Sequence, residues 1–171
     1  MRSMLLDQIA WGENNGFDDV WLSEYHFIED GYLPSILPVA AAIAARTKRI
    51  RIASGVILMP FHNPVRLAED IAVVDVISGG RLELGLGVGY KVEEFESFGA
   101  PFKERGARTN ESLGIVRRLL DGETVTLKSK FFDFNNRHEP PAHPRIMKIV
   151  YAHRAPDTRE RRLRLVPKVR K

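Results

Sequence analysis

The sequence predicts an α/β fold built on parallel strands. Segments with helical spacing of apolar residues alternate with short apolar segments typical of strands. The connections between successive strands are long enough to hold a helix, as parallel pairing requires. Hydrophobic residues make up 44% of the 171 residues and charged residues 28%, as expected for one globular domain. Two architectures remain open at this point, an open doubly wound sheet and part of a (β/α)8 barrel.

The first strand and the helices on either side of it are delimited by capping and breaking residues. Ser3 can cap a first helix, which Gly16 ends. Residues 19–27 are apolar and aromatic enough to predict a strand. Pro34 then opens a second helix over 35–47, rich in alanine and with branched apolar residues on one side. Helix, strand and helix therefore follow one another in the first part of the chain.

The middle of the chain repeats this order. Residues 49–59 predict a second strand, which a proline follows. Asn63 is a strong N-cap for a third helix, since Pro64 at the first helical position needs no backbone donor. That helix is expected to reach residue 77, and a third strand to cover 82–89. These elements form a second β-helix-β unit, which is right-handed in nearly all proteins.

The remaining elements are less regular. A loop leads to a fourth helix over 103–120, which Gly122 ends. Residues 124–134 predict a small hairpin, and residues 146–151 a fourth main strand. No internal repeat is visible beyond the alternation of helix and strand.

Three glycines at alternate positions of the third strand resemble a phosphate-binding loop. A dinucleotide fingerprint, however, needs G-x-G-x-x-G opening directly into a helix, and Gly85, Gly87 and Gly89 are followed by a loop. Strand alternation explains the pattern better, because the intervening leucines then share one face and the glycines the other. We therefore expect one face of this strand to be almost free of side chains, so that a flat ligand can lie against the backbone.

Candidate acid/base residues follow the first strand. Glu24, Tyr25 and His26 lie toward its carboxyl end, where α/β enzymes place their chemistry. Because side chains alternate along a strand, Tyr25 and His26 are expected to point to opposite faces unless the strand has already ended. His62 is most simply a loop histidine, although its place after the second strand would also let it line the site.

Other features have simpler interpretations. Trp11 and Trp21 are expected in the core rather than stacked against a ligand, and Glu93 and Glu94 on a solvated face. His138 and His143 lie among prolines without the spacing of metal ligands, so no metal site is predicted.

The charge of the chain is unevenly distributed. The net charge is +4, but residues 144–171 alone hold ten Lys or Arg and two acids. This stretch has no interleaved aromatic residues, so a solvated tail is favoured and nucleic-acid binding is not expected. The chain has no cysteine, no apolar run long enough for a membrane span and no export signal at its start, which together predict a cytoplasmic protein.

Four ordered motifs resemble one known family. They are GFDDVWLSEYHF (16–27), AARTKRIRIASGV (44–56), PFHNPVRLAED (60–70) and DVISGGRLELGLGVGY (75–90). The chain resembles the luciferase-like flavin-dependent monooxygenases, relatives of bacterial luciferase, over about residues 16–134. On this basis we divide the chain into a barrel domain, 1–134, and a divergent basic tail, 135–171, expected to be poorly ordered.

The resemblance implies a (β/α)8 barrel that binds reduced FMN or, in one branch, a deazaflavin. Such an enzyme passes electrons to oxygen or to a small organic substrate, and a flavin reductase can supply it. A full barrel takes roughly 250 residues, so this chain is expected to form a partial barrel, truncated in its carboxy-terminal half. Open sheet edges and uncovered apolar faces then predict a homo-oligomer.

Site residues follow from the same resemblance. It places a non-proline cis peptide or bulge, beneath the flavin ring, at Ser54, Gly55 and Val56. The residues implied along the edge of the ring are Gly85, Gly87, Val88 and Tyr90. It maps the catalytic or substrate-positioning histidine to His26, in the motif that also holds Glu24 and Tyr25.

Two residues depart from the family pattern. Tyr25 stands where many relatives have a first histidine, and Val88 where luciferase has an arginine that meets the flavin phosphate. The sequence therefore supports two functions. The first is a flavin-dependent oxidoreductase acting on an organic substrate, and the second is an inactive relative that binds flavin weakly or serves as an association module.

Overall fold

The computed structural model describes residues 2–29, 31–134 and 148–152. The helices and strands in these ranges are, in order, α1 (Arg2–Asn14), β1 (Asp19–Leu22), α2 (Ile36–Arg46), β2 (Arg51–Ser54), β3 (Ile57–Leu58), η1 (Met59–Phe61), α3 (Pro64–Ser78), β4 (Leu82–Gly87), α4 (Val92–Ser97), η2 (Phe102–Glu104), α5 (Arg105–Leu120), β5 (Leu127–Lys128), β6 (Asp133–Phe134) and β7 (Lys148–Ala152). None of the helices in these ranges is long and apolar enough to cross a membrane.

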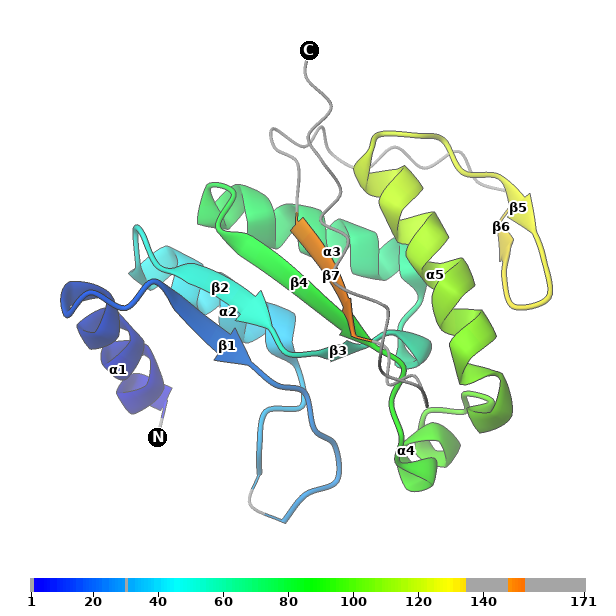
Figure 1. Cartoon of the computed structure of the whole chain (residues 1–171), viewed down its shortest axis with the longest axis horizontal. Helices are drawn as coiled ribbons and strands as arrows, with labels where there is room; N and C mark the ends of the chain where they lie inside the picture. Colours follow the sequence, from blue (N-terminus) through cyan, green and yellow to red (C-terminus); the bar gives the residue numbers. More distant parts are fainter. Residues whose placement is uncertain (1, 30, 135–147, 153–171) are drawn as a thin grey trace, which may run out of the picture.

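A five-stranded parallel sheet forms the centre of the described structure (Figure 1). β1 pairs with β2, both β2 and β3 pair with one edge of β4, and β7 pairs with β4 as well. The strands thus lie side by side in chain order, without the reversal that defines a doubly wound sheet. This order is that of the wall of a (β/α)8 barrel, and the partial barrel predicted from the sequence is confirmed.

The main helices lie against one face of the sheet and along its sides (Figure 1). Leu82, Leu84 and Leu86 of β4 point toward this layer and are fully buried, as their alternation predicts. The opposite face carries Trp21 of β1, which is 59% exposed. The prediction that Trp21 belongs to the core was wrong, because this face has no helical layer among the described residues.

Several boundaries differ from those the sequence predicts. β1 ends at Leu22 rather than at residue 27, and the strand expected over 49–59 is broken into β2 and β3. α1 begins at Arg2, so Ser3 is not its cap, and the loop after β4 contains the short helix α4. The expected hairpin is confirmed as the antiparallel pair β5 and β6, and the fourth main strand as β7.

The start of α3 follows the sequence prediction closely. The Asn63 side-chain oxygen accepts hydrogen bonds from the backbone N–H groups of Val65 and Arg66, at 2.9 and 3.2 Å. Pro64 occupies the first helical position, and Gly79 ends the helix in the left-handed conformation. A well-defined α3 fixes the direction in which the preceding segment, η1 and His62, leaves the sheet.

Arg81 joins the carboxyl ends of α2 and α3. Its Nη1 donates to Thr47 Oγ1 and to the Ile50 carbonyl, at 2.8 and 2.9 Å. Its Nη2 donates to the Ala44 and Thr47 carbonyls, at 2.8 and 3.0 Å, and its Nε to the Ser78 carbonyl at 2.7 Å. A cation at this place satisfies carbonyls that a helix end leaves unpaired and is favoured by the helix dipole.

Replacing Arg81 by lysine is expected to lower the free energy of unfolding by about 2–3 kcal/mol, because an ammonium keeps the charge but cannot reproduce the fork of five hydrogen bonds. Urea denaturation measures the change. The matched control is Arg46→Lys, since Arg46 is exposed and pairs with Asp7 at 2.9 Å, and it is expected to change stability by less than about 0.5 kcal/mol. Equal effects of the two substitutions would contradict the role of Arg81.

Glu13 binds the backbone that enters β2. One of its carboxylate oxygens accepts N–H groups from Lys48, Arg49 and Ile50, at 3.0, 2.5 and 2.8 Å. Desolvation raises the pKa of Glu13, but these backbone N–H groups and the charge of Arg49 lower it, and the net pKa lies below the ordinary value.

The lowered pKa of Glu13 predicts a pH-dependent contribution to stability. The contribution is fully present above the ordinary carboxyl pKa, and it is lost as the pH falls through the lower pKa of the folded state. Glu13→Gln is therefore expected to destabilise the protein at pH 7 and to change stability much less at strongly acidic pH. Thermal melts of both proteins across this range test the expectation, and Glu96→Gln, at an exposed position of α4, provides the control.

Candidate active site

The candidate site lies where the carboxyl ends of neighbouring strands meet. The segment after β1 carries Glu24 and His26, the turn after β3 carries His62, and the segment after β4 leads to Glu94 in α4. The carboxyl ends of parallel strands form the functional end of α/β barrels. Residues distant in the sequence are thus brought to one end of the sheet.

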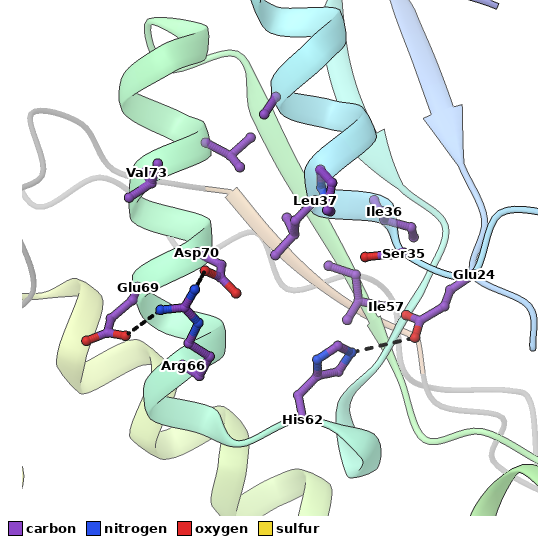
Figure 2. A pocket seen from close by; sticks show the side chains of 13 residues that line it. Glu24, Ser35, Ile36, Leu37, Ile57, His62, Arg66, Glu69, Asp70 and Val73 are labelled. Carbon is purple, nitrogen blue, oxygen red and sulfur yellow. Dashed lines mark ion pairs between the residues drawn. The ribbon is translucent and has the colours of Figure 1, made fainter. Parts of the chain in front are cut away.

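Glu24 is the centre of this site. It is 7% exposed, and its Oε2 accepts the backbone N–H of Leu58 at 2.9 Å. Its Oε1 lies 2.8 Å from His26 Nε2 and 3.6 Å from His62 Nε2. The second distance is too long for a hydrogen bond, and the buried His62 Nε2 has no hydrogen-bond partner within the described structure. Figure 2 shows the His62 ring turned toward the carboxylate.

The Glu24 carboxyl is ionised at neutral pH. Burial raises its pKa, but the His62 imidazole, the Leu58 N–H and His26 lower it, so that the net pKa lies below the ordinary value. An ionised carboxylate only accepts hydrogen bonds. The hydrogen bond at 2.8 Å therefore requires a proton on His26 Nε2. In neutral His26 the lone pair is then on Nδ1, which is the atom able to take a proton.

Aromatic rings surround His26. The His26 ring makes edge contacts with Phe98, at 4.7 Å between centroids, and with Phe61, at 5.9 Å, and the residue is 9% exposed. Its backbone N–H donates to Glu94 Oε1 at 3.4 Å, and the same oxygen lies 3.8 Å from Lys91 Nζ. The imidazole is thus held by a carboxylate on one side and shielded from water by phenylalanines on the other.

Tyr25 lies apart from this pair. Its ring packs edge-on against Tyr32 at 5.3 Å between centroids, and Lys91 Nζ lies 5.3 Å from the ring centroid. The alternation expected for Tyr25 and His26 does not apply, because β1 ends at Leu22, before both residues. Of the three predicted acid/base residues, the structure brings together Glu24 and His26.

A bulge separates β2 from β3. Four residue steps lead from Ala53 to Ile57, whereas their partners on β4, Glu83 and Leu86, are three steps apart. The extra residue lies within Ser54, Gly55 and Val56, as the family resemblance implies, and the Gly55–Val56 peptide is cis.

Ser54 replaces the missing strand pairing at the bulge. Its hydroxyl accepts the N–H of Gly85 and donates to the Gly85 carbonyl, both at 2.9 Å. On the other side, Gly55 donates its N–H to the Leu22 carbonyl at 2.7 Å and accepts the Ser23 hydroxyl at 3.0 Å. The bulge is therefore fixed to both neighbouring strands.

The structure explains why β4 carries glycine at positions 85 and 87, which the sequence alone does not predict. A Cβ on Gly85 would overlap the Ser54 carbonyl oxygen, and one on Gly87 would lie 2.5 Å from Val56 Cγ2. Both glycines are buried beneath the bulge. The expectation of a bare face on which a ligand contacts these two glycines directly was therefore wrong. The glycines give room for the bulge, and the bulge, half-buried at Gly55 and Val56, forms the outer surface.

The segment after β4 is more open. Val88 is half-buried and Tyr90 is 67% exposed. Gly89, between them, adopts a φ of +73° in the left-handed region and packs against Phe95. The segment 88–90 thus continues from β4 toward the phenylalanine cluster around His26.

Two site residues are not predicted by the sequence. His62 was only a possible lining residue, and Glu94 was expected on a solvated face but is 3% exposed. The contact of Glu94 with His26 joins residues far apart in the chain, which no local pattern indicates. The one available signal for Glu94 is the apolar spacing of Phe95 and Phe98 beside it, which marks α4 as a packed helix.

A parallel α/β barrel wall with a buried carboxylate–histidine pair at its carboxyl end is typical of barrel enzymes. A profile of the luciferase-like monooxygenase family matches residues 3–161. The chain belongs to this family. The match also extends past residue 134, where the sequence resemblance was expected to end.

Individual relatives agree with this assignment. The chain is 34% identical over 137 residues to an F420-dependent glucose-6-phosphate dehydrogenase from Amycolatopsis mediterranei, covering 75% of this chain and 41% of the relative. Among solved structures it matches the monooxygenase RslO1 from Streptomyces bottropensis, with a TM-score of 0.74, 34% identity and coverage of 85% and 45%. It also matches the oxygenating constituent of 3,6-diketocamphane monooxygenase from Pseudomonas putida in complex with FMN, with a TM-score of 0.70, 26% identity and coverage of 75% and 37%. The chain thus spans less than half the length of each of these relatives.

Proposed function

We propose that this chain carries the acid/base and ring-binding part of an oxidoreductase that uses reduced FMN or a deazaflavin on a small organic substrate. The observation that supports it most is the buried Glu24–His26 pair, which the Leu58 N–H joins to β3, the strand that follows the Ser54–Val56 bulge. Relatives with FMN and with F420 both occur in the family. Oxygen as co-substrate, a flavin reductase as electron donor and a homo-oligomer are part of the same proposal.

The residues of the bulge fit a flat apolar ring. Gly55 and Val56 are half-buried, and a Cβ on Gly55 would lie 3.0 Å from the exposed Trp21 ring, so backbone and indole form one continuous surface. Ser54, Gly85 and Gly87 would support this surface from below, while Val88 and Tyr90 would border the ring. When bound, the reduced ring supplies the electrons for oxygen or for the organic substrate.

The protein's own groups would handle the proton. His26 Nδ1 is the free acceptor in the neutral ring, and Glu24 holds the other nitrogen at 2.8 Å, which fixes both the tautomer and the ring orientation. The phenylalanines around His26 exclude water, which strengthens the electrostatic interaction of this pair. His26 is the catalytic residue in this proposal and Glu24 its positioning residue, while Tyr25, which packs beside Tyr32 and Lys91, would contact the substrate.

The proposal is tested by comparing FMN with riboflavin, which lacks the phosphate. Val88 supplies no positive charge where luciferase has arginine. FMN and riboflavin are therefore both expected to lose fluorescence on binding, with affinities within about threefold of each other. A charge-assisted phosphate contact would instead separate the two affinities by about tenfold or more. Reduced F420 is titrated in parallel by absorbance. The absence of binding by all three compounds at high protein concentration would overturn the proposal.

The alternative, an association module without catalysis, is favoured by one observation. The face of the sheet that carries Trp21 is open in the described structure, whereas a closed barrel would cover it. Sedimentation of the purified chain together with flavin turnover separates the two functions. A stable oligomer that binds flavin but shows no turnover with any oxidant or organic substrate would support the alternative.

A further inference from the structure

One carboxylate oxygen faces two imidazoles in this site. Glu24 Oε1 lies 2.8 Å from His26 Nε2 and 3.6 Å from His62 Nε2, while Oε2 is taken by the Leu58 N–H. Both imidazoles therefore face the same carboxylate oxygen and are stabilised by its charge when they are protonated. A change in the protonation of one ring changes the field in which the other ring titrates.

The two rings face different spaces. His26 is 9% exposed and lies among phenylalanines, whereas the His62 side chain is 36% exposed and lines a groove of about 670 Å³ between α2 and α3. Glu24 lines the same groove from its inner end, and Figure 2 shows the two side chains meeting there. The carboxylate thus stands between the enclosed site and the groove.

Other charged groups near the two histidines already have partners. On the His26 side, Glu94 accepts the His26 backbone N–H and lies 3.8 Å from Lys91. On the groove side, Arg66 pairs with Glu69 at 3.5 Å and with Asp70 at 3.1 Å. Glu24 is therefore the carboxylate through which the charge of one imidazole affects the protonation of the other.

We propose that His62 is a positioning residue whose protonation is coupled to that of His26 through the Glu24 carboxylate that both rings face. The effect of this coupling on turnover rests on the proposed function, but the coupling is a property of the protein alone.

The coupling is measured by NMR titration of the histidine side chains in the purified chain without any cofactor. The chain has five histidines, and loss of one signal in His26→Gln and in His62→Gln assigns these two. His62→Gln is expected to raise the titration midpoint of His26 by about half a pH unit or more, because a cation that competes for Glu24 is removed. His26→Gln is expected to raise the midpoint of His62 by the same amount, since coupling is reciprocal.

Two further variants complete the experiment. Glu24→Gln is expected to lower both midpoints, while Ser35→Ala, a groove position without an ionisable group, is expected to leave both unchanged. Circular dichroism verifies that each variant is folded. Unchanged midpoints in both histidine variants would overturn the proposal even if the chain binds flavin, and the expected shifts in a chain that binds no flavin would uphold it while the proposed function fails.

Discussion

Replacing His26 by glutamine is expected to lower flavin-dependent turnover by about 10²–10⁴-fold, the usual contribution of a general acid/base. Glutamine can still donate to Glu24, so the buried carboxylate keeps a partner and the fold is retained. What is lost is the acceptor nitrogen on the other side of the ring. The measurement is the rate of oxidation of reduced FMN or F420 with a panel of small aldehydes, ketones and alcohols, as a function of pH.

The pH profile distinguishes a proton-transfer role from a structural one. In the unmodified protein, the plot of turnover against pH is expected to contain a limb due to His26. In His26→Gln that limb should disappear, while FMN affinity changes much less than the rate. Arg46→Gln, on the exposed surface of α2, is the control and should retain full turnover. A His26→Gln protein with unaltered turnover and an unaltered profile would remove His26 from the mechanism.

The second large effect is expected at Gly85. Gly85→Ala places a methyl group against the Ser54 carbonyl oxygen. The Ser54 hydroxyl is bonded to β4 on one side, and the next residue, Gly55, donates its N–H to the Leu22 carbonyl on the other side, so this backbone cannot easily move aside. Overpacking of this kind costs about 1–3 kcal/mol, and contact with fixed backbone places the effect at or above the top of that range. We expect a fall in the free energy of unfolding of about 3 kcal/mol or more, measured by urea denaturation.

Gly114→Ala provides the matched control for Gly85→Ala. Gly114 lies inside α5, and nothing within 4 Å would meet its Cβ. The same chemical change should here stabilise the protein by about 0.5–1 kcal/mol, because alanine is the better helix former. Changes of the same sign and size at both positions would show that the bulge does not fill the space above Gly85.

The fold was predicted well where local chemistry decides it. The capping residues Asn63 and Pro64 are enough to predict the start of α3. The alternating leucines of β4 predict its buried face without knowledge of the neighbouring strands. The break between β2 and β3 was not predicted from strand propensity, since residues 49–59 carry branched apolar residues on both sides of Ser54 and Gly55. Only the family resemblance indicated it, because a bulge is specified by its neighbours on β1 and β4.

The sequence predicted part of the candidate site and missed the rest. Glu24 and His26 were predicted because they follow the first strand closely, at the end where α/β enzymes place their chemistry. His62 and Glu94 reach them from other strand ends, and nothing in their own segments indicates these contacts. The alternating glycines of β4 predict which face lacks side chains, but their cause lies in Ser54 and Val56, at the bulge between β2 and β3.

The hydrogen bond from the Leu58 N–H to Glu24 has a consequence for experiment. This amide belongs to β3, next to the bulge, and its acceptor is the carboxylate that serves His26. Its nitrogen and proton chemical shifts therefore respond to the charge on Glu24. In a uniformly nitrogen-labelled protein, a single backbone resonance would report when a proton enters or leaves the pair, without a substrate analogue or an engineered probe at the site.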